Sequence, residues 1–328
     1  MKAIWYDRLG PAEDVLQYGD QPTPEAGPGE VRVRLQASGV NPADVKRRTG
    51  SFGMEYPLIV PHSDGAGIVD QVGDGADPAL LGQRVWLFNG QRNGRHLGTA
   101  AEFIALDAWL VAPLPDTVSF AEGACLGIPC MTAHYNVFAD GPVAGKTVLV
   151  TGGAGAVGHY AVQWAKWGGA TVIATVSSPE KAAYAITGGA DHTIDYRRED
   201  VGARVMAITD GAGADRIVEV DIEANFQSSL AALKPGGTIA TYATTPRAKP
   251  GFSFIPAAVK NAVLRFMILY AVPRPAIDAA RADIATWLAA GPRMHTVAAR
   301  FPLAETGAAH QFVEAGGKLG TVIVEPNH

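Results

Sequence analysis

The chain has 328 residues, of which 48% are hydrophobic and 18% charged, and its 27 basic and 32 acidic side chains give a formal net charge of −5. This composition is typical of a globular protein with about two domains, and the lack of any basic block argues against a nucleic-acid-binding surface. The first residues hold no long apolar run, and the apolar segment 261–273 is too short to span a bilayer, so we expect neither a secretory signal nor a membrane segment. The only two cysteines, Cys125 and Cys130, suggest no disulfide framework, and we expect a cytoplasmic protein.

The first 120 residues or so contain short strand-like runs separated by glycine and proline. Residues 30–40 partly alternate polar and apolar side chains, as a half-buried strand does, and they follow a turn at 27–29. Two further β-like runs, 65–75 and 82–88, are each bounded by glycine. The pattern predicts a small, glycine-rich, mostly β domain.

The character of the chain changes near residue 123, where a helical segment leads into alternating strands and helices. Such alternation predicts βαβ units and a parallel sheet with helices on both faces. After this region, residues 264–273 read as a last strand, 275–291 as an amphipathic helix and 319–325 as one more strand. The elements expected within the alternating region are strands 147–150, 171–176, 192–196, 215–220 and 236–243 and helices 155–167, 179–187, 201–209 and 226–233.

Three glycines after the strand 147–150, namely Gly153, Gly155 and Gly158, have the spacing G-x-G-x-x-G. A strand before and a helix after the motif are the context in which it binds a dinucleotide, because the turn directs backbone N–H groups and a helix N-terminus toward the pyrophosphate. In this interpretation Gly155 admits the phosphate and Gly158 allows tight helix–strand packing. The alternative is a glycine-rich turn that binds nothing.

The end of the strand 171–176 indicates which dinucleotide is bound. NAD-binding units place an acidic residue there for the ribose hydroxyls, whereas this strand ends in Ser177 and Ser178, with Lys181 one helical turn further on. Hydroxyls and an ammonium group suit a 2′-phosphate, which favours NADP. The alternative, compatible with the first, is that Ser178 caps the next helix and Lys181 faces solvent.

The order of a β-rich region, a βαβ region and a C-terminal return resembles the medium-chain dehydrogenase/reductase superfamily, and within it the zinc-free quinone oxidoreductases of the zeta-crystallin-like group. The matching segments occur in one order along nearly the whole chain: SGVNPADVKRRTG (38–50), PHSDGAGIVDQVG (61–73), GTAAEF (98–103), GACLGIPCMTAHY (123–135), VLVTGGAGAVG (148–158) and LKPGGTIATYA (233–243).

The resemblance implies an α/β protein with two domains. A GroES-like β-rich catalytic domain would span 1–123 and be completed by 272–328, and a Rossmann-type, doubly wound NADP-binding domain would span 124–271, with the cofactor in the cleft. Members of this group are usually homodimers that join the edge strands of their cofactor domains, and 264–271 would be that strand here.

The resemblance also bears on zinc. Zinc-dependent members use an early cysteine and a His-Glu pair in GHEGAG, whereas this chain has Asn41 in the first region and Ser63-Asp64 in the second, with His62 one position out of register. We therefore expect no metal site, and we interpret His62 as a packed or hydrogen-bonded loop residue. Without Lewis-acid catalysis, an already electrophilic acceptor such as a quinone or an enone is the expected substrate.

By the resemblance, three residues are candidates for the catalytic site. Asn41 would donate to an acceptor oxygen, Lys46 stands where many relatives have tyrosine and leaves room for an anionic acceptor, and Thr132 would lie near the nicotinamide ribose. Asp44 and Arg48, four residues apart, are expected to form structural hydrogen bonds or an ion pair.

The patterns and the resemblance together define a larger cofactor set, in which Phe52 and Tyr242 have the alternative of being core aromatics. That set is Phe52, Gly153, Ala154, Gly155, Ala156, Val157, Gly158, Ser177, Lys181, Tyr196, Asn225, Tyr242, Ala243, Thr244, Thr245, Leu269 and Tyr270.

These residues favour an NADPH-dependent, zinc-independent quinone oxidoreductase. An enone or enoyl-thioester reductase on the same fold is the first alternative, because a fold does not fix its substrate. A non-catalytic NADPH-binding sensor or structural protein is the second.

Overall fold

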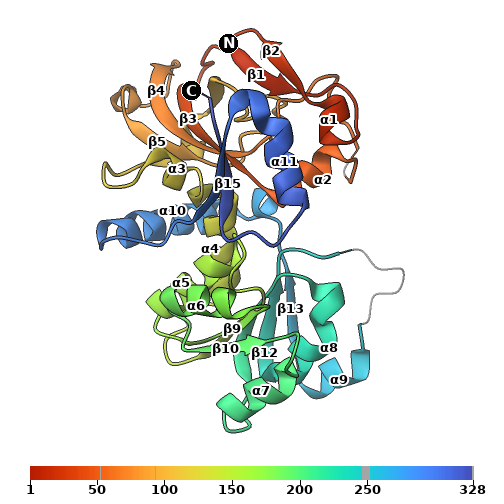
Figure 1. The fold of residues 1–328 in the computed structure, drawn as a ribbon. Coiled ribbons are helices and arrows are strands. Elements are labelled where there is room, and N and C mark those ends of the chain that lie inside the picture. Colours follow the sequence, from red (N-terminus) through yellow and green to blue (C-terminus); the bar gives the residue numbers. More distant parts are fainter. Residues whose placement is uncertain (52, 93, 246–251, 327–328) are drawn as a thin grey trace. The chain divides into compact units, whose positions relative to one another are not determined.

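A computed structural model describes the chain at residues 1–51, 53–92, 94–245 and 252–326 (Figure 1). The chain forms two compact units, which we call the first and the second unit. The first comprises Met1–Pro129 and Arg281–His328, and the second comprises Cys130–Ala280. The assignment of catalytic and NADP-binding roles to separate domains, with the boundaries given above, stays a prediction.

The first unit contains a seven-stranded, mainly antiparallel sheet, as expected for its glycine-rich β pattern. Its central strand is β3 (Glu30–Val40), whose bounds are those predicted, and Val31, Val33 and Leu35 on one face of it are fully buried. A separate antiparallel pair is formed by β1 (Lys2–Trp5) and β2 (Gln17–Asp20). The order of the main sheet is β14 (Val297–Pro302), β15 (Thr321–Glu325), β3, β4 (Asp64–Val72), β5 (Arg84–Leu87) and β7 (Val111–Pro113), with β6 (Phe103–Asp107) also paired to β3.

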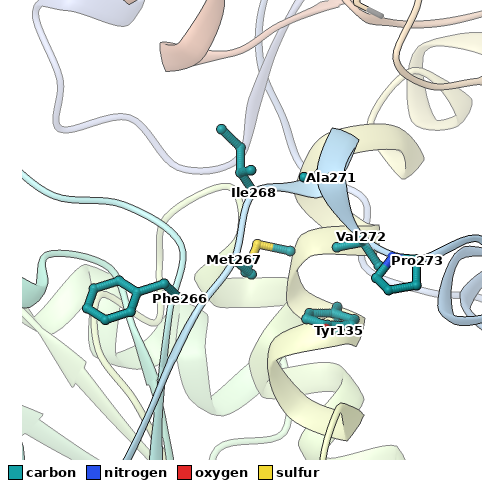
Figure 2. Close-up of a pocket in the computed structure, with 7 residues that line it drawn as sticks. All are labelled: Tyr135, Phe266, Met267, Ile268, Ala271, Val272 and Pro273. Carbon is teal, nitrogen blue, oxygen red and sulfur yellow. The ribbon is translucent and has the colours of Figure 1, made fainter.

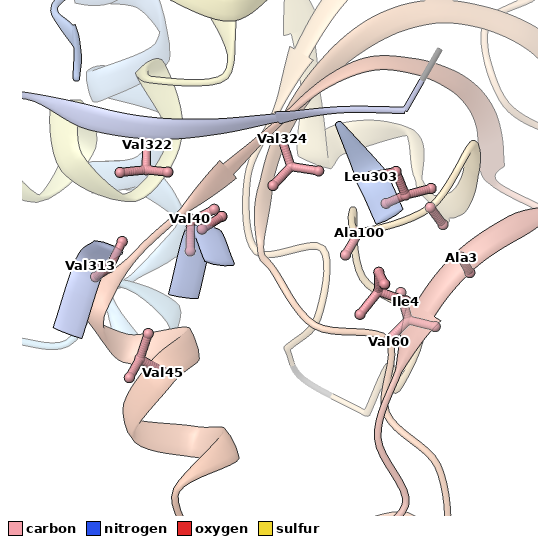
Figure 3. Close-up of a cluster of buried hydrophobic side chains, with 12 residues drawn as sticks. Ala3, Ile4, Val40, Val45, Val60, Ala100, Leu303, Val313, Val322 and Val324 are labelled. Atoms are coloured by element: carbon pink, nitrogen blue, oxygen red, sulfur yellow. The ribbon is translucent and has the colours of Figure 1, made fainter. Parts of the chain in front are cut away.

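The C-terminal segment completes the core of the first unit. Figure 3 shows Val322 and Val324 of β15 in one buried cluster with Val40 of β3 and Ile4 of β1. Helix α11 (Thr306–Glu314) adds Val313 to the same cluster. The remaining helical elements of this unit are α1 (Ala12–Val15), α2 (Pro42–Arg48), η1 (Pro78–Leu80), η2 (Ala108–Leu110), α3 (Phe120–Gly123), η3 (Leu126–Cys130) at its boundary, and η5 (Leu303–Glu305).

The second unit is a doubly wound α/β structure, which confirms the predicted fold class. Its six strands are all parallel, and their spatial order of third, second, first, fourth, fifth and sixth is that of dinucleotide-binding sheets. Helices cover both faces of the sheet (Figure 1). Along the sheet the strands are β10 (His192–Asp195), β9 (Thr171–Val176), β8 (Thr147–Val150), β11 (Ala214–Glu219), β12 (Leu233–Thr241) and β13 (Val263–Phe266).

Most helices of the second unit lie where the sequence predicts them. The helix expected from residue 155 begins only at Gly158, because 151–157 form a turn. The helix expected from 226 begins earlier, at Ile222, since the Asp221 carboxylate accepts from the Ala224 amide and caps it. The helices are α4 (Met131–Phe138), α5 (Gly158–Trp167), α6 (Pro179–Thr187), α7 (Val201–Ile208), α8 (Ile222–Ala232), α9 (Phe254–Val259), η4 (Leu269–Ala271) and α10 (Arg274–Ala289), within which the unit boundary falls.

None of the helices in the described ranges is long and apolar enough to cross a lipid bilayer.

A chain of buried hydrogen bonds links α11 to the sheet of the first unit. Arg48 Nε donates to His310 Nδ1 (3.3 Å), His310 Nε2 lies 2.9 Å from His62 Nε2, and His62 Nδ1 lies 2.9 Å from Ser38 Oγ. Ser38 contacts the Thr99 hydroxyl (2.7 Å), which donates to the backbone oxygen of residue 64 (2.7 Å). Because a donor begins the chain and an acceptor ends it, all its bonds point one way and both imidazoles are neutral.

This chain confirms that His62 is a buried, hydrogen-bonded loop residue. Arg48 also pairs with Glu314 and with the Gly10 carbonyl, so its ion pair is with α11 and not with Asp44. Burial lowers the pKa of His62 from 6.5 to about 4, and it lowers the pKa of His310 as well. Protonation of either ring would break the chain of bonds and leave a charge in the core.

The neutral histidine pair predicts acid sensitivity. Because the pKa of His62 is depressed on folding, its contribution to stability is complete above its ordinary pKa of 6.5 and is lost as the pH falls toward 4. Between these values we expect a loss of about 3 kcal/mol in the free energy of unfolding, measured by urea denaturation.

In the variant His62→Asn this loss should shrink, and asparagine suits the left-handed backbone at this position (φ 74°). The variant His192→Gln, on an exposed part of β10, controls for the removal of one histidine. An unchanged pH dependence in His62→Asn would contradict the assignment of a neutral pair.

Candidate active site

The turn after β8 has a backbone that only glycine permits at several positions. Gly152 has φ of 64°, a Cβ on Gly153 would lie 2.7 Å from the Ala174 side chain of β9, and a Cβ on Gly158 would overlap the Gly152 carbonyl oxygen. Close packing against a strand is therefore made by Gly153, whereas Gly158 brings the start of α5 against the turn itself. The turn lies where the strand order reverses, between β8 and β11, which is the position at which such sheets bind ligands.

A buried carboxylate at the end of β11 supports this turn. Glu219 is fully buried, and it accepts hydrogen bonds from the hydroxyls of Thr151 (3.0 Å) and Ser229 (2.6 Å) and from the backbone amide of Asp221 (2.7 Å). The side-chain amide of Asn225, a predicted cofactor contact, also donates to it (2.8 Å). The sequence analysis did not predict Glu219, although an acidic residue directly after Ile217 and Val218 in the expected strand 215–220 was a usable signal.

At the end of β9 the structure brings together the residues predicted to hold a 2′-phosphate. Lys181 Nζ donates to Ser177 Oγ (3.2 Å), and Ser178 caps α6 by accepting from the Lys181 amide (3.3 Å). Tyr196 follows the neighbouring strand β10, its amide donates to Val176 O (3.2 Å), and half of its side chain is exposed. The predicted helix cap at Ser178 is confirmed, and the binding of a 2′-phosphate by these residues stays a prediction.

The remaining predicted cofactor residues follow strands of the same sheet or lie near its edge. Residues 242–245 follow β12, and the backbone amides of Tyr242 and Thr245 donate to Glu219 O (3.3 Å) and to an Asp221 carboxylate oxygen (3.1 Å). Leu269 is buried and Tyr270 half-buried in η4. Thr132 is buried near the start of α4, and Phe52 lies outside the described residues.

In the first unit the predicted acceptor contact, Asn41, is held by two carboxyl groups. Its side-chain Nδ2 donates to Asp64 Oδ2 (2.7 Å) and its backbone amide donates to Asp44 Oδ2 (2.9 Å), with which it forms a capping box at the start of α2. Asn41, Asp44 and Asp64 are each at most 3% exposed, and Arg92 pairs with Asp44 at 3.5 Å. Lys46, on the same helix, is exposed.

Asp64 is the most perturbed carboxyl of this region. Its Oδ1 accepts from the backbone amide of Ile128 (2.9 Å), and burial raises its pKa to about 8 despite its two hydrogen bonds. The approach of residue 64 to the segment η3 requires glycine at position 127, where a Cβ would overlap the carboxyl group. Sequence reasoning compared Asp64 with the zinc-site glutamate but did not predict its contact with Asn41.

Metal ligands do not converge anywhere in the described part of the chain: no three His, Cys, Asp or Glu side chains are placed to hold an ion. Ser63 and His62 are both buried beside Asp64, and His62 is engaged in the chain of hydrogen bonds described above. The absence of a metal stays a prediction.

An open apolar pocket of about 330 Å³ lies within the second unit, beside the edge strand β13 (Figure 2). Of the described residues that line it, none belongs to the predicted catalytic or cofactor set. The lining residues are Tyr135, Phe266, Met267, Ile268, Ala271, Val272 and Pro273.

Comparison with known proteins places these features in a family. Residues 27–116 match the model of the alcohol dehydrogenase GroES-like domain, and residues 156–284 match that of the zinc-binding dehydrogenases. A quinone oxidoreductase of Pseudomonas aeruginosa is 31% identical over 99% of both chains, and a 2-haloacrylate reductase of a Burkholderia species is 30% identical over the same shares. A mycobacterial structure complexed with NADPH is 32% identical, with a TM-score of 0.88 over 99% of this chain and 100% of that one.

The chain belongs to the quinone oxidoreductase family of the medium-chain dehydrogenase/reductase superfamily, as its segments indicated.

The geometry of the turn predicts unequal effects of alanine at two of its glycines. Alanine at Gly158 must displace the Gly152 carbonyl group, and we expect it to lower the free energy of unfolding by about 1–3 kcal/mol. Alanine at Gly155, whose Cβ would lie 3.3 Å from the same oxygen, should have a clearly smaller effect. Urea denaturation of the two variants measures the difference, and equal losses would contradict the close approach at Gly158.

Proposed function

We propose that this chain is an NADPH-dependent, zinc-independent oxidoreductase that reduces quinones. The observation that carries the proposal is the pairing of Ser177 with Lys181 at the end of β9, in the same sheet as the glycine turn to which we assign the pyrophosphate. Family membership supports the reaction class, and the mycobacterial relative complexed with NADPH supports the cofactor.

The residues of the second unit fit this cofactor. The turn 153–158 would hold the pyrophosphate through backbone amides and the N-terminus of α5, and Ser177, Lys181 and Tyr196 would hold the 2′-phosphate. When bound, NADPH supplies the hydride for reduction. Asn225, residues 242–245, Leu269, Tyr270 and Phe52 complete the proposed cofactor set.

On the acceptor side, we assign to Asn41 the hydrogen bond to a carbonyl oxygen of the substrate. Reduction of a quinone yields a stabilised hydroquinone anion, so a neutral donor suffices and no strong general acid is required. Lys46, which is exposed, would attract an anionic acceptor, and Thr132 would help to position the nicotinamide ribose.

An activated alkene is the second candidate substrate, favoured by the full-length similarity to a 2-haloacrylate reductase. Such a substrate needs a proton at the carbon next to its carbonyl group, in addition to polarisation of that group. The location we propose is cytoplasmic, in keeping with a sequence that holds only two cysteines.

Steady-state oxidation of NADPH and NADH with a panel of quinones, enones and 2-haloacrylate tests the proposal. We expect turnover of quinones with NADPH strongly preferred over NADH. Turnover of alkenes but of no quinone would support the alternative, an alkene reductase. Equal use of NADPH and NADH would contradict the assignment of Ser177 and Lys181 to the 2′-phosphate.

In the same assay, Lys181→Ala should raise KM for NADPH about 10- to 100-fold and leave KM for NADH nearly unchanged, as the loss of a charge-assisted hydrogen bond requires. Lys234→Ala is the matched control, because Lys234 forms its ion pair with Asp215 near the start of strand β11 (2.8 Å).

We further propose a homodimer that joins two β13 strands. β13 is the edge strand of its sheet, and apolar side chains gather on it and on the adjacent helix α9. The exposed fractions of Phe254, Val259 and Phe266 are 79%, 76% and 64%. Exposed apolar side chains beside an unpaired strand edge are characteristic of strand-to-strand association.

Light scattering after size-exclusion chromatography checks this assembly. The expected result is a dimer for the unmodified protein and a monomer for Phe266→Lys. Phe312→Lys, at a 41% exposed position on α11, is the control and should remain dimeric. A monomeric unmodified protein would rule out the proposed dimer.

A further inference from the structure

The contact between Asn41 and Asp64 assigns a role to a residue that carries out no chemistry itself. We propose that Asp64 is a positioning residue, which fixes the side-chain amide of Asn41 so that its second N–H is presented to the acceptor oxygen. This inference rests on the proposed function, because it requires an acceptor at Asn41.

An asparagine amide has two similar ends, and its rotation exchanges a donor for an acceptor. At Asn41 the capping box at the start of α2 directs the oxygen end of the amide toward the Asp44 backbone amide, and the nitrogen end faces Asp64. Asn41 Nδ2 donates to Asp64 Oδ2 at 2.7 Å. If the amide were turned round, its oxygen would face an ionised carboxylate, and no hydrogen bond could form because both groups only accept. The contact therefore selects the orientation that leaves one amide N–H for a ligand.

Asp64 can fix Asn41 because it is itself held from three sides. Its other carboxyl oxygen accepts from the Ile128 amide (2.9 Å), and its backbone oxygen accepts from the Thr99 hydroxyl, which ends the buried chain of hydrogen bonds (2.7 Å). Gly127 leaves the space that the carboxyl group occupies. A residue whose two carboxyl oxygens and backbone oxygen all accept hydrogen bonds has little freedom to move.

The charge of Asp64 bears on the same role. Burial opposes ionisation and raises the pKa of its carboxyl group to about 8, whereas its bonds to Asn41 and Ile128 favour the ionised carboxylate. The ionised form accepts at both oxygens, and this form selects the amide orientation of Asn41. Two other charged groups act on Asp64. These are Asp44 and Arg92, which form an ion pair with each other at 3.5 Å.

A double-mutant cycle tests whether Asp64 acts through Asn41. Asp64→Asn keeps the shape of the side chain but replaces one acceptor oxygen by an NH₂ group. The two groups that face this side chain, the Asn41 amide and the Ile128 backbone N–H, are both donors, so one of the two hydrogen bonds must be lost. Asn41→Ala removes the proposed donor. We expect each single variant to lower kcat/KM for a quinone about tenfold, and the double variant to be no worse than Asn41→Ala.

Three further readouts separate positioning from general damage. The dissociation constant for NADPH should be unchanged in all variants, and the midpoint of thermal unfolding shows whether each variant is folded. Binding of a non-reducible quinone analogue to the NADP⁺-loaded protein should weaken in both single variants. Thr306→Val is the matched control: it removes a buried hydroxyl bond to Leu303 O (2.7 Å) in the same unit and should leave kcat/KM unchanged.

If Asp64→Asn does not fold, Gly127→Ala provides the second perturbation, because its methyl group displaces the carboxyl without changing its chemistry. Its effect should likewise disappear in the Asn41→Ala background. Additive losses in either cycle would overturn the role of Asp64 while leaving the proposed function intact. No turnover of any acceptor by the unmodified protein would contradict the proposed function and the inference with it.

Discussion

The structure of the second unit depends on one backbone contact, the approach of Gly158 to the Gly152 carbonyl oxygen. Because no side chain fits between them, α5 begins directly behind the turn, and its N-terminal amides lie at the edge where the strand order reverses. Glu219 holds the turn from the neighbouring strand through Thr151. The second unit therefore presents a turn of fixed shape, which we propose binds the pyrophosphate, and the hydroxyl and ammonium groups after β9 are proposed to bind the 2′-phosphate.

The first unit uses buried polar groups for a comparable purpose. A one-way chain of hydrogen bonds runs from Arg48 through two neutral histidines to the backbone of Asp64, whose carboxyl group then holds Asn41. Unpaired, such groups would destabilise the core, but with every member bonded they restrict it to one arrangement. The same network thus links the C-terminal helix α11 to the residue proposed to contact the acceptor, which explains physically why the C-terminal segment belongs to this unit.

Local patterns predict much of the second unit, since strands 147–150 and 171–176 and the helix 179–187 have the predicted bounds. The strand expected over 264–273 is wrong in its second half, because β13 ends at Phe266 and η4 follows it. Apolar runs between glycine, serine and proline signals define these elements from their own residues. The late start of α5 and the early start of α8 depended on turn and cap geometry, which a periodic pattern does not contain. The contact of Asn41 with Asp64 joins positions 23 apart, and that of Arg48 with His310 joins positions 262 apart, so no local signal specifies either. Family resemblance predicted a role for Asn41, but only the fold shows which residues hold its side chain.

The most direct test of the proposed cofactor site is a crystal structure of the protein with NADP⁺ bound. The pyrophosphate is expected against the backbone of 153–158, with the 2′-phosphate within hydrogen-bonding distance of Ser177 Oγ and Lys181 Nζ. A dinucleotide bound elsewhere, or a 2′-phosphate that contacts neither Ser177 nor Lys181, would contradict the proposal that the residues after β9 select NADPH.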